Sequence, residues 1–255
     1  MKYAIVSKKN KDSENVKKML MDKLIELGYE YDDENPNIIF SIGGDGTFLR
    51  SVKFYLDKNP IFVGINTGNL GFLCEFNKDN IDDIFSKIDE KNIKEIKLIE
   101  CSYNNLTVYG LNEVRVESLN GTSTLFEVYF NNQYFESVKA DGLCVCSSHG
   151  SSGINRSMGG ALIDTNLDVL EFKEKLPINS KKYKALNSSV VFNGDTNIKI
   201  KVNDRYALGV AYDSTFNIDK INTEITIKLS NKTIKVLSNN VSYLTKIKES
   251  FLWKL

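Results

Sequence analysis

Short apolar runs alternate with helical apolar spacing over the first hundred residues, and this alternation restricts the fold more than any other feature. The runs KYAIVS (2–7), NIIFSI (37–42) and IFVGI (61–65) are typical of buried strands. The segments between them have the spacing of amphipathic helices. Strands that alternate with helices predict an α/β domain, with a parallel sheet covered by helices.

Three helices are predicted between and after these strands. The first begins at a Ser13 cap, ends at Gly28, and carries Val16, Leu20, Leu24 and Leu27 on its inner face. The second covers residues 47–55 and the third covers residues 81–88.

From about Lys97 the helical spacing gives way to alternation with a period of two. In NIKIKV (197–202), Ile198, Ile200 and Val202 face one way and the lysines face the other. The run EITIKLSNKTIKVL (224–237) predicts a hairpin that turns at residues 230–232. These patterns predict a mostly antiparallel, sandwich-like β domain.

The closing segment, residues 241–255, predicts a helix with Leu244, Ile247 and Phe251 on one stripe, packed back on the N-terminal domain. The expected organisation is therefore an α/β domain over residues 1–98, joined by the helix at about 241–255. A β-rich domain is expected over residues 99–240.

Composition narrows the possible partners. Lys and Arg number 33, equal to Asp and Glu, so the net charge of zero gives no reason to expect nucleic acid or a membrane as partner. No apolar run approaches the roughly 18–20 residues of a membrane helix, and the first run is too short for a signal peptide. We expect a cytoplasmic protein with four reduced cysteines. With one histidine and no C-x-x-C pair, no metal-ligating side chain can be named.

The sequence GGDGT (43–47) lies between the second predicted strand and the second predicted helix. Ligands of open α/β sheets bind at the carboxyl ends of the strands. Gly43, Gly44 and Gly46 allow backbone N–H groups to approach phosphate oxygens, and Thr47 can cap the helix or contact a phosphate. The loop is neither a Walker A motif nor a G-x-G-x-x-G fingerprint.

Asp45 is unexpected in a phosphate loop, because a carboxylate repels phosphate. Two interpretations follow from the residues. Asp45 caps the helix, or it takes the proton from a hydroxyl that attacks a nearby phosphoryl group.

The chain resembles the NAD kinase family over most of its length. The resemblance is carried by six segments in order: GGDGT (43–47), GINTGNLGFL (64–73), LNEV (111–114), KADGLCVCSSHGSSGINRSMGGALI (139–163), AYDS (211–214) and SYLTKIKESFLWKL (242–255). GGDGT alone is weak evidence, since lipid kinases and phosphofructokinases share close variants. The ordered set is specific.

The resemblance implies a reaction and its substrates. Asp45 would activate the 2′-hydroxyl of the adenosine ribose of NAD, which would attack the γ-phosphate of ATP. Gly43, Gly44, Gly46 and Thr47 would hold phosphates, and a divalent cation, Mg²⁺, would accompany ATP. Relatives form dimers or tetramers whose NAD site takes groups from a neighbouring subunit, so a homodimer or homotetramer is expected.

The resemblance also implies a set of NAD-binding residues. They are Asp45, Gly46, Asn112, Glu113, Lys139, Asp141, Ser152, Gly153, Ile154, Asn155, Arg156, Ser157, Leu176 and Asp213. From residue type alone, Asn112 and Glu113 are a polar strand start and Asp141 is a turn residue. Lys139 equally suits a solvent-facing strand position, and Leu176 suits a core.

Residues 147–154 depart from the family pattern. The family reads Thr-Pro-x-Gly-Ser-Thr-Ala-Tyr where this chain has SSHGSSGI, so tyrosine becomes Ile154. Isoleucine neither stacks as an aromatic ring does nor offers a hydroxyl, which predicts weaker NAD binding. Two alternatives to an NAD kinase function stay open. The chain could be a diacylglycerol-type lipid kinase, or a non-catalytic relative that binds a dinucleotide.

Overall fold

The computed structural model describes residues 1–68, 71–119, 121–202, 208–219 and 224–252. The chain forms two units, one from residues 1–96 and 233–255 and the other from residues 97–232. Strands β6 (Ile93–Tyr103) and β17 (Glu224–Leu237) contribute residues to both. The roles predicted for residues 1–98 and 99–240 stay predictions.

The first unit is built on the predicted parallel sheet. Its strands are β1 (Lys2–Ser7), β2 (Glu30–Tyr31), β3 (Ile38–Gly43), β4 (Ile61–Asn66) and β5 (Phe76–Asn77). Their order is β2-β1-β3-β4, and both β5 and the end of β17 pair with β4. The pairings among β1 to β5, and that of β17 with β4, are parallel, so β1, β3 and β4 end at one edge.

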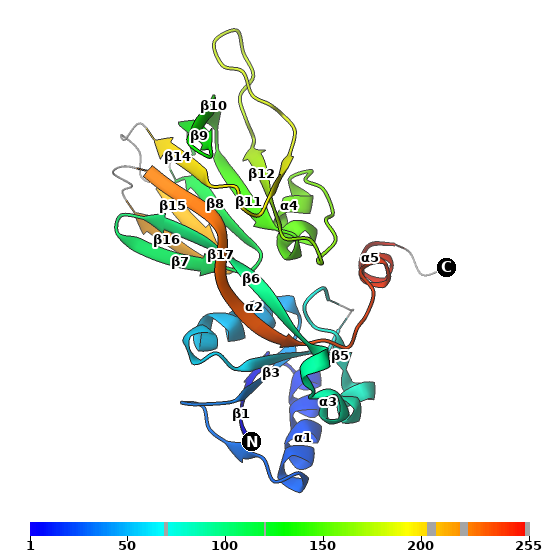
Figure 1. The fold of residues 1–255 in the computed structure, drawn as a ribbon. Helices are drawn as coiled ribbons and strands as arrows, with labels where there is room; N and C mark the ends of the chain where they lie inside the picture. The colour runs from blue at the N-terminus through cyan, green and yellow to red at the C-terminus, as the bar shows by residue number, and fades with distance from the viewer. Residues whose placement is uncertain (69–70, 120, 203–207, 220–223, 253–255) are drawn as a thin grey trace. The chain divides into compact units, whose positions relative to one another are not determined.

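Helices cover both faces of this sheet (Figure 1). Those on its faces are α1 (Lys11–Glu26), α2 (Asp45–Tyr55) and α3 (Ile81–Lys87). Helix α5 (Tyr243–Phe251) also belongs to this unit, as do short 3₁₀ turns at Leu56–Lys58, Lys78–Asn80 and Glu90–Asn92. The apolar stripes of α1 and α3 share one core cluster with β3 and β4. The ring of Phe48 on α2 packs against Phe62, with centroids 6.0 Å apart.

Two details of α1 differ from the sequence prediction. The helix begins earlier, and Asn10 rather than Ser13 caps it, because the Asn10 side chain accepts the Ser13 N–H at 2.9 Å. Leu27 is 44% exposed, since it is already the C-cap residue and leaves the buried stripe. Gly28 follows with φ +70°, as expected of a helix stop.

The closing helix is confirmed over Tyr243–Phe251, but Leu244 does not belong to its inner stripe. Leu244 is 76% exposed, and Lys246 is the buried residue of the helix. A buried carboxylate partner for Lys246, described below, fixes this orientation. Residues 253–255 of the predicted helix lie outside the described residues.

The second unit is an antiparallel β sandwich, as predicted. One sheet has the order β10-β9-β14-β17-β6-β7, and the other has the order β13-β12-β11-β8-β15-β16. The bounds in the first are β7 (Leu106–Gly110), β9 (Thr124–Phe130), β10 (Gln133–Ala140) and β14 (Ile198–Val202). Those in the second are β8 (Glu113–Ser118), β11 (Gly142–Ser147), β12 (Val169–Lys175), β13 (Val190–Asn193), β15 (Leu208–Tyr212) and β16 (Thr215–Asp219). Two short helices, His149–Ser152 (3₁₀) and α4 (Ile154–Ser157), follow β11.

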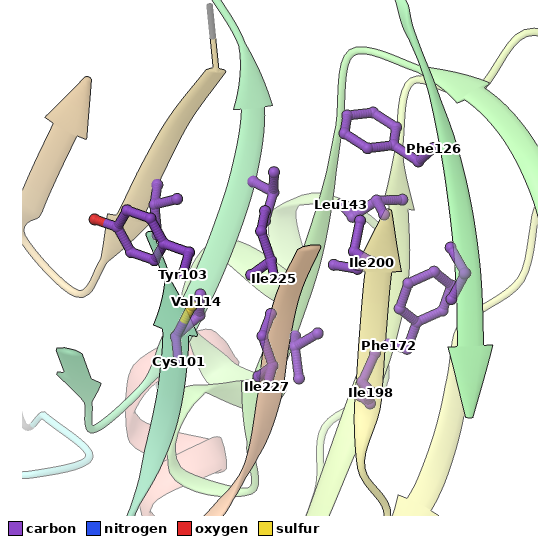
Figure 2. Close-up of a cluster of buried hydrophobic side chains, with 14 of the residues drawn as sticks. Cys101, Tyr103, Val114, Phe126, Leu143, Phe172, Ile198, Ile200, Ile225 and Ile227 are labelled. Carbon is purple, nitrogen blue, oxygen red and sulfur yellow. The ribbon is translucent and has the colours of Figure 1, made fainter. Parts of the chain in front are cut away.

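Apolar side chains from both sheets meet in one core (Figure 2). Ile198 and Ile200 of β14 are fully buried there, which confirms the period-two prediction for this strand. Phe126 and Phe172 come from opposite sheets and are also fully buried. The core fixes which face of each strand points inward.

The hairpin predicted at residues 230–232 is wrong, because β17 continues through them. The polar residues are satisfied within the sheet rather than by a turn. Ser230 Oγ donates to Glu100 on β6 at 3.2 Å and accepts the N–H of Lys232 at 3.0 Å.

Among the described residues, no helix is long and apolar enough to cross a membrane.

Candidate active site

The glycine loop joins β3 directly to α2. Gly43 ends the strand with φ +155°, and a Cβ there would lie 2.4 Å from Oγ1 of Thr47. Gly44 is the N-cap and α2 begins at Asp45, two residues before the predicted start. The first N–H groups of a helix have no acceptor within it, so those of Asp45 and Gly46 suit an anion. Thr47 is buried and is not the cap.

Asp45 is held by a turn that is distant in sequence. Its Oδ2 accepts the N–H of Phe72 at 2.8 Å, and its Oδ1 accepts those of Leu73 and Cys74 at 3.0 and 3.3 Å. A Cβ on Gly71 would lie 2.2 Å from Oδ1, so glycine is required for this approach. Gly44 rather than Asp45 is the N-cap of α2, and the Asp45 carboxylate accepts from residues 72–74, which contradicts the helix-cap interpretation of Asp45. We call residues 71–74 the Asp45 turn.

Asn112 and Glu113 stand at the start of β8, and Asp213 orders their backbone. Asp213 lies between β15 and β16, and its carboxylate accepts the N–H groups of Leu111 and Asn112 at 2.8 and 2.7 Å. The Asp213 N–H donates to the Glu113 carbonyl at 3.1 Å. Asp213, predicted as a ligand for NAD, thus contacts the polypeptide that presents Asn112 and Glu113.

The segment at the end of β11 and after it places its backbone against Asn112 and Glu113. Ser147 Oγ donates to the Leu111 carbonyl at 2.7 Å, and a Cβ on Gly150 would lie 2.0 Å from the Asn112 carbonyl oxygen. A Cβ on Gly153 would lie 3.9 Å from both Asn112 Nδ2 and Glu113 Oε2. The structure therefore brings Asn112, Glu113 and Gly153 together, with half-buried Ser152 and Ile154 as the chain neighbours of Gly153. We call these five residues and Asp213 the Asn112 group.

Two features of the Asn112 group are unusual for a purely structural role. The Oδ1 of Asn112 is buried without a hydrogen-bond partner among the described residues. Burial raises the pKa of Glu113 from its ordinary 4.5 to about 7, and Asp213 adds to this while Arg115 opposes it. Buried polar atoms normally have partners, so this acceptor suits a ligand donor.

Three predicted residues of α4 have different environments. Asn155 is fully buried, and its Nδ2 donates to Glu171 Oε2 at 2.7 Å. Glu171 also accepts the Ala161 N–H at 2.8 Å, so Asn155 helps to fix the loop after α4. Arg156 and Ser157 are exposed.

Lys139, Asp141 and Leu176 form a second group, which we call the Lys139 group. The Asp141 N–H donates to the Lys175 carbonyl at 3.0 Å, directly before Leu176, which is 69% exposed. Lys139 Nζ lies 5.2 Å from the ring centroid of Tyr183.

Strand β11 separates the Lys139 group from the Asn112 group. Its first residue, Gly142, follows Asp141, and Cys146 near its other end pairs with Glu113. At about 3.3 Å per residue, the two groups lie roughly 15 Å apart along the strand.

Sequence reasoning missed several residues beside the glycine loop. Lys8 follows β1, and its Cβ lies 3.2 Å from the position that a Cβ on Gly43 would occupy. Its position directly after the first buried strand could have identified it. Nothing in the sequence links Phe72, Leu73 and Cys74 to Asp45. No group of three or more His, Cys, Asp or Glu suited to a metal ion occurs among the described residues.

A glycine-rich loop between a parallel strand and a helix, with a fixed carboxylate, is an arrangement that suits a nucleotide-binding protein. Two solved structures share this fold. One is an NAD kinase from Archaeoglobus fulgidus in complex with ATP, with a TM-score of 0.80 and 23% identity over 94% of each chain. The other is yeast NADH kinase complexed with NADH, with a TM-score of 0.82 and 15% identity over 100% of this chain and 89% of that one.

Sequence comparison gives the family. The ATP-NAD kinase N-terminal domain matches residues 3–93 and the ATP-NAD kinase C-terminal domain matches residues 111–238. The NAD kinase of Limosilactobacillus reuteri is 27% identical over 99% of this chain and 98% of its own. NAD kinase 1 of Listeria monocytogenes is 32% identical over 75% of this chain and 76% of its own. The chain belongs to the NAD kinase family, which confirms the resemblance and does not favour a lipid kinase.

Proposed function

We propose that this protein transfers the γ-phosphate of ATP to the 2′-hydroxyl of the adenosine ribose of NAD, giving NADP. One observation carries the proposal. In a chain of this family, the Asp45 carboxylate in the middle of the glycine loop is fixed by the Asp45 turn, and Gly44 is the cap of the helix. A fixed carboxylate beside bound phosphate suits a general base.

We assign Oδ2 of Asp45 as the oxygen that accepts the proton of the attacking hydroxyl. Each carboxylate oxygen has about two lone-pair sites. From the described residues Oδ1 accepts two N–H groups and Oδ2 accepts one, so Oδ2 keeps the capacity to accept the hydroxyl. The hydrogen bonds hold the carboxylate in one orientation while the hydroxyl attacks phosphorus.

ATP binds, in this proposal, through the N–H groups of Gly44, Asp45 and Gly46, with Gly43 and Thr47 shaping the loop. Mg²⁺ enters as part of the ATP substrate, where it neutralises phosphate charge.

NAD binds through the Asn112 group, where the buried Asn112 Oδ1 and the Glu113 carboxylate accept hydrogen bonds from ribose hydroxyls or the carboxamide. We assign the Lys139 group to NAD bound by a neighbouring subunit of a homodimer or homotetramer. Leu176 is 69% exposed and so is accessible to a neighbouring subunit, which supports this assignment.

We place the enzyme in the cytoplasm, where its thiols stay reduced. All four cysteines are free and buried, and burial raises the pKa of Cys101 to about 12. Such thiols react slowly.

The test is a turnover assay with ATP, NAD and Mg²⁺ that measures NADP with an NADP-specific dehydrogenase. Phosphorus NMR of the product distinguishes a 2′-phosphate from other esters. Parallel reactions replace ATP by polyphosphate, NAD by NADH, and NAD by diacylglycerol in micelles. The proposal expects 2′-phosphorylated NAD from ATP. No NADP, or transfer to lipid instead, would overturn it.

A further inference from the structure

A buried lysine on the closing helix lies next to the turn that holds Asp45. Lys246 is 6% exposed, although lysine is rarely buried unless it is paired. Its Nζ lies 2.6 Å from Glu75 Oε1 and donates to the Phe72 carbonyl at 2.8 Å. Glu75 Oε2 accepts Ser238 Oγ at 2.9 Å and the Asn239 N–H at 2.7 Å, so both buried charges are satisfied.

Phe72 is the residue that joins this ion pair to Asp45. Its N–H donates to Asp45 Oδ2, and its carbonyl accepts from Lys246. Its ring stacks on Phe251 with centroids 5.4 Å apart and meets Tyr243 edge-on at 6.0 Å. Helix α5 therefore holds Phe72 through one polar and two aromatic contacts.

An ion pair is not needed simply to dock α5. Buried ion pairs are often replaceable by apolar residues of similar size without loss of stability, and the two ring contacts already attach the helix. The Lys246 contact does something the rings cannot do, because it fixes the carbonyl of Phe72 and hence the plane of the Phe72–Leu73 peptide, whose N–H donates to Asp45 Oδ1. The orientation of the Asp45 carboxylate depends on that turn.

We propose that Lys246 is a positioning residue for phosphoryl transfer, which acts through Phe72 to hold the Asp45 carboxylate in its reactive orientation. The expected effect of Lys246 on turnover rests on the proposed function, whereas its expected effect on the Asp45 turn does not.

Four proteins test the proposal: wild type, Lys246→Met, the double variant Lys246→Met/Glu75→Gln, and the control Lys248→Met. Methionine keeps most of the lysine's apolar length. The double variant also removes the carboxylate charge that the single variant leaves buried without its lysine. Lys248 is exposed on the same helix. Amide hydrogen exchange of Phe72, Leu73 and Cys74 is followed by NMR, with kcat, KM and the melting temperature measured alongside.

Lys246→Met should speed exchange of these three amides by about tenfold or more. It should lower kcat about tenfold to a hundredfold while KM for ATP and NAD stays within about threefold, because misorientation of a reacting group costs rate before binding. The double variant should recover the melting temperature but not kcat or slow exchange. Lys248→Met should match the wild type.

Unchanged exchange in Lys246→Met would overturn the proposal. Recovery of kcat and slow exchange together with stability in the double variant would also overturn it, since Lys246 would then be purely structural. If the wild type forms no NADP, the proposed function fails, and the exchange measurement still decides whether Lys246 holds the turn.

Discussion

The Asp213 carboxylate accepts the backbone N–H of Asn112 at 2.7 Å, from a position 101 residues later in the chain. Asp213 adopts a left-handed backbone conformation, with φ +48°, in the connection between β15 and β16. Burial raises its pKa, and hydrogen bonds from Leu111, Asn112 and Glu113 oppose this rise. The family's late aspartate therefore serves here to present the Asn-Glu pair.

Asp213→Asn should weaken NAD binding without affecting ATP. An amide offers an acceptor at one end only, so one backbone N–H would face an NH₂ group. The loss should cost about 1–3 kcal/mol of unfolding free energy. KM for NAD should rise about threefold to tenfold, and KM for ATP should stay unchanged. Denaturant unfolding and steady-state kinetics measure both, with exposed Asp195→Asn as control. An unchanged KM for NAD in a destabilised variant would separate Asp213 from the dinucleotide site.

Glu113 predicts a pH-dependent stability. Its pKa is raised to about 7, so the folded protein retains a proton that the unfolded chain loses near pH 4.5. Between these values stability falls as pH rises, and the full cost persists above about pH 7. Glu113→Gln should therefore stabilise the protein at pH 8 by on the order of 2 kcal/mol more than at pH 5. Urea unfolding at both pH values checks this, with exposed Glu249→Gln as the control. An equal effect at both pH values would show that Glu113 does not titrate in this range.

Ile154 gives a prediction about affinity. Ile154 is half-buried and follows Gly153, which lies against Asn112 and Glu113. Ile154→Tyr adds a ring worth about 0.5–1.5 kcal/mol in stacking, and a hydroxyl. KM for NAD should fall about threefold to tenfold, with little change for ATP. A melting curve controls for overpacking. A well-folded variant with unchanged or higher KM for NAD would place Ile154 away from the dinucleotide.

Oligomerisation and NAD binding are tested together. A ligand that binds only the folded state must raise the melting temperature. We expect light scattering to give a dimer or tetramer, and millimolar NAD to stabilise it. A monomer with no thermal shift in NAD would contradict both the shared site and the proposed substrate.

Local patterns predicted the parallel sheet and the sandwich because each depends on spacing within one segment. Ile198 and Ile200 alternate and are buried, and GGDGT follows a buried strand as expected. The hairpin at residues 230–232 failed because Glu100, on another strand, satisfies Ser230.

The parts of the site that could not be predicted depend on contacts between distant residues. Phe72 to Cys74 reach Asp45 across 27–29 positions, and Lys246 meets Glu75 across 171. No local rule favours a buried lysine over Leu244, so Leu244 was wrongly placed on the inner stripe of α5. Asp213 was identified by type, but its action on the backbone of Asn112 required the structure.

Asp45→Asn tests the central claim most directly. The variant keeps the size of the side chain but removes the base, and one N–H of the Asp45 turn would face an amide NH₂ group. Single-turnover NADP formation should fall about a hundredfold to ten-thousandfold, while calorimetry gives an NAD Kd within about threefold of wild type. Retained NAD binding shows that the loss is chemical rather than a collapse of the site. Turnover within about threefold of wild type would contradict a role for Asp45 as the base.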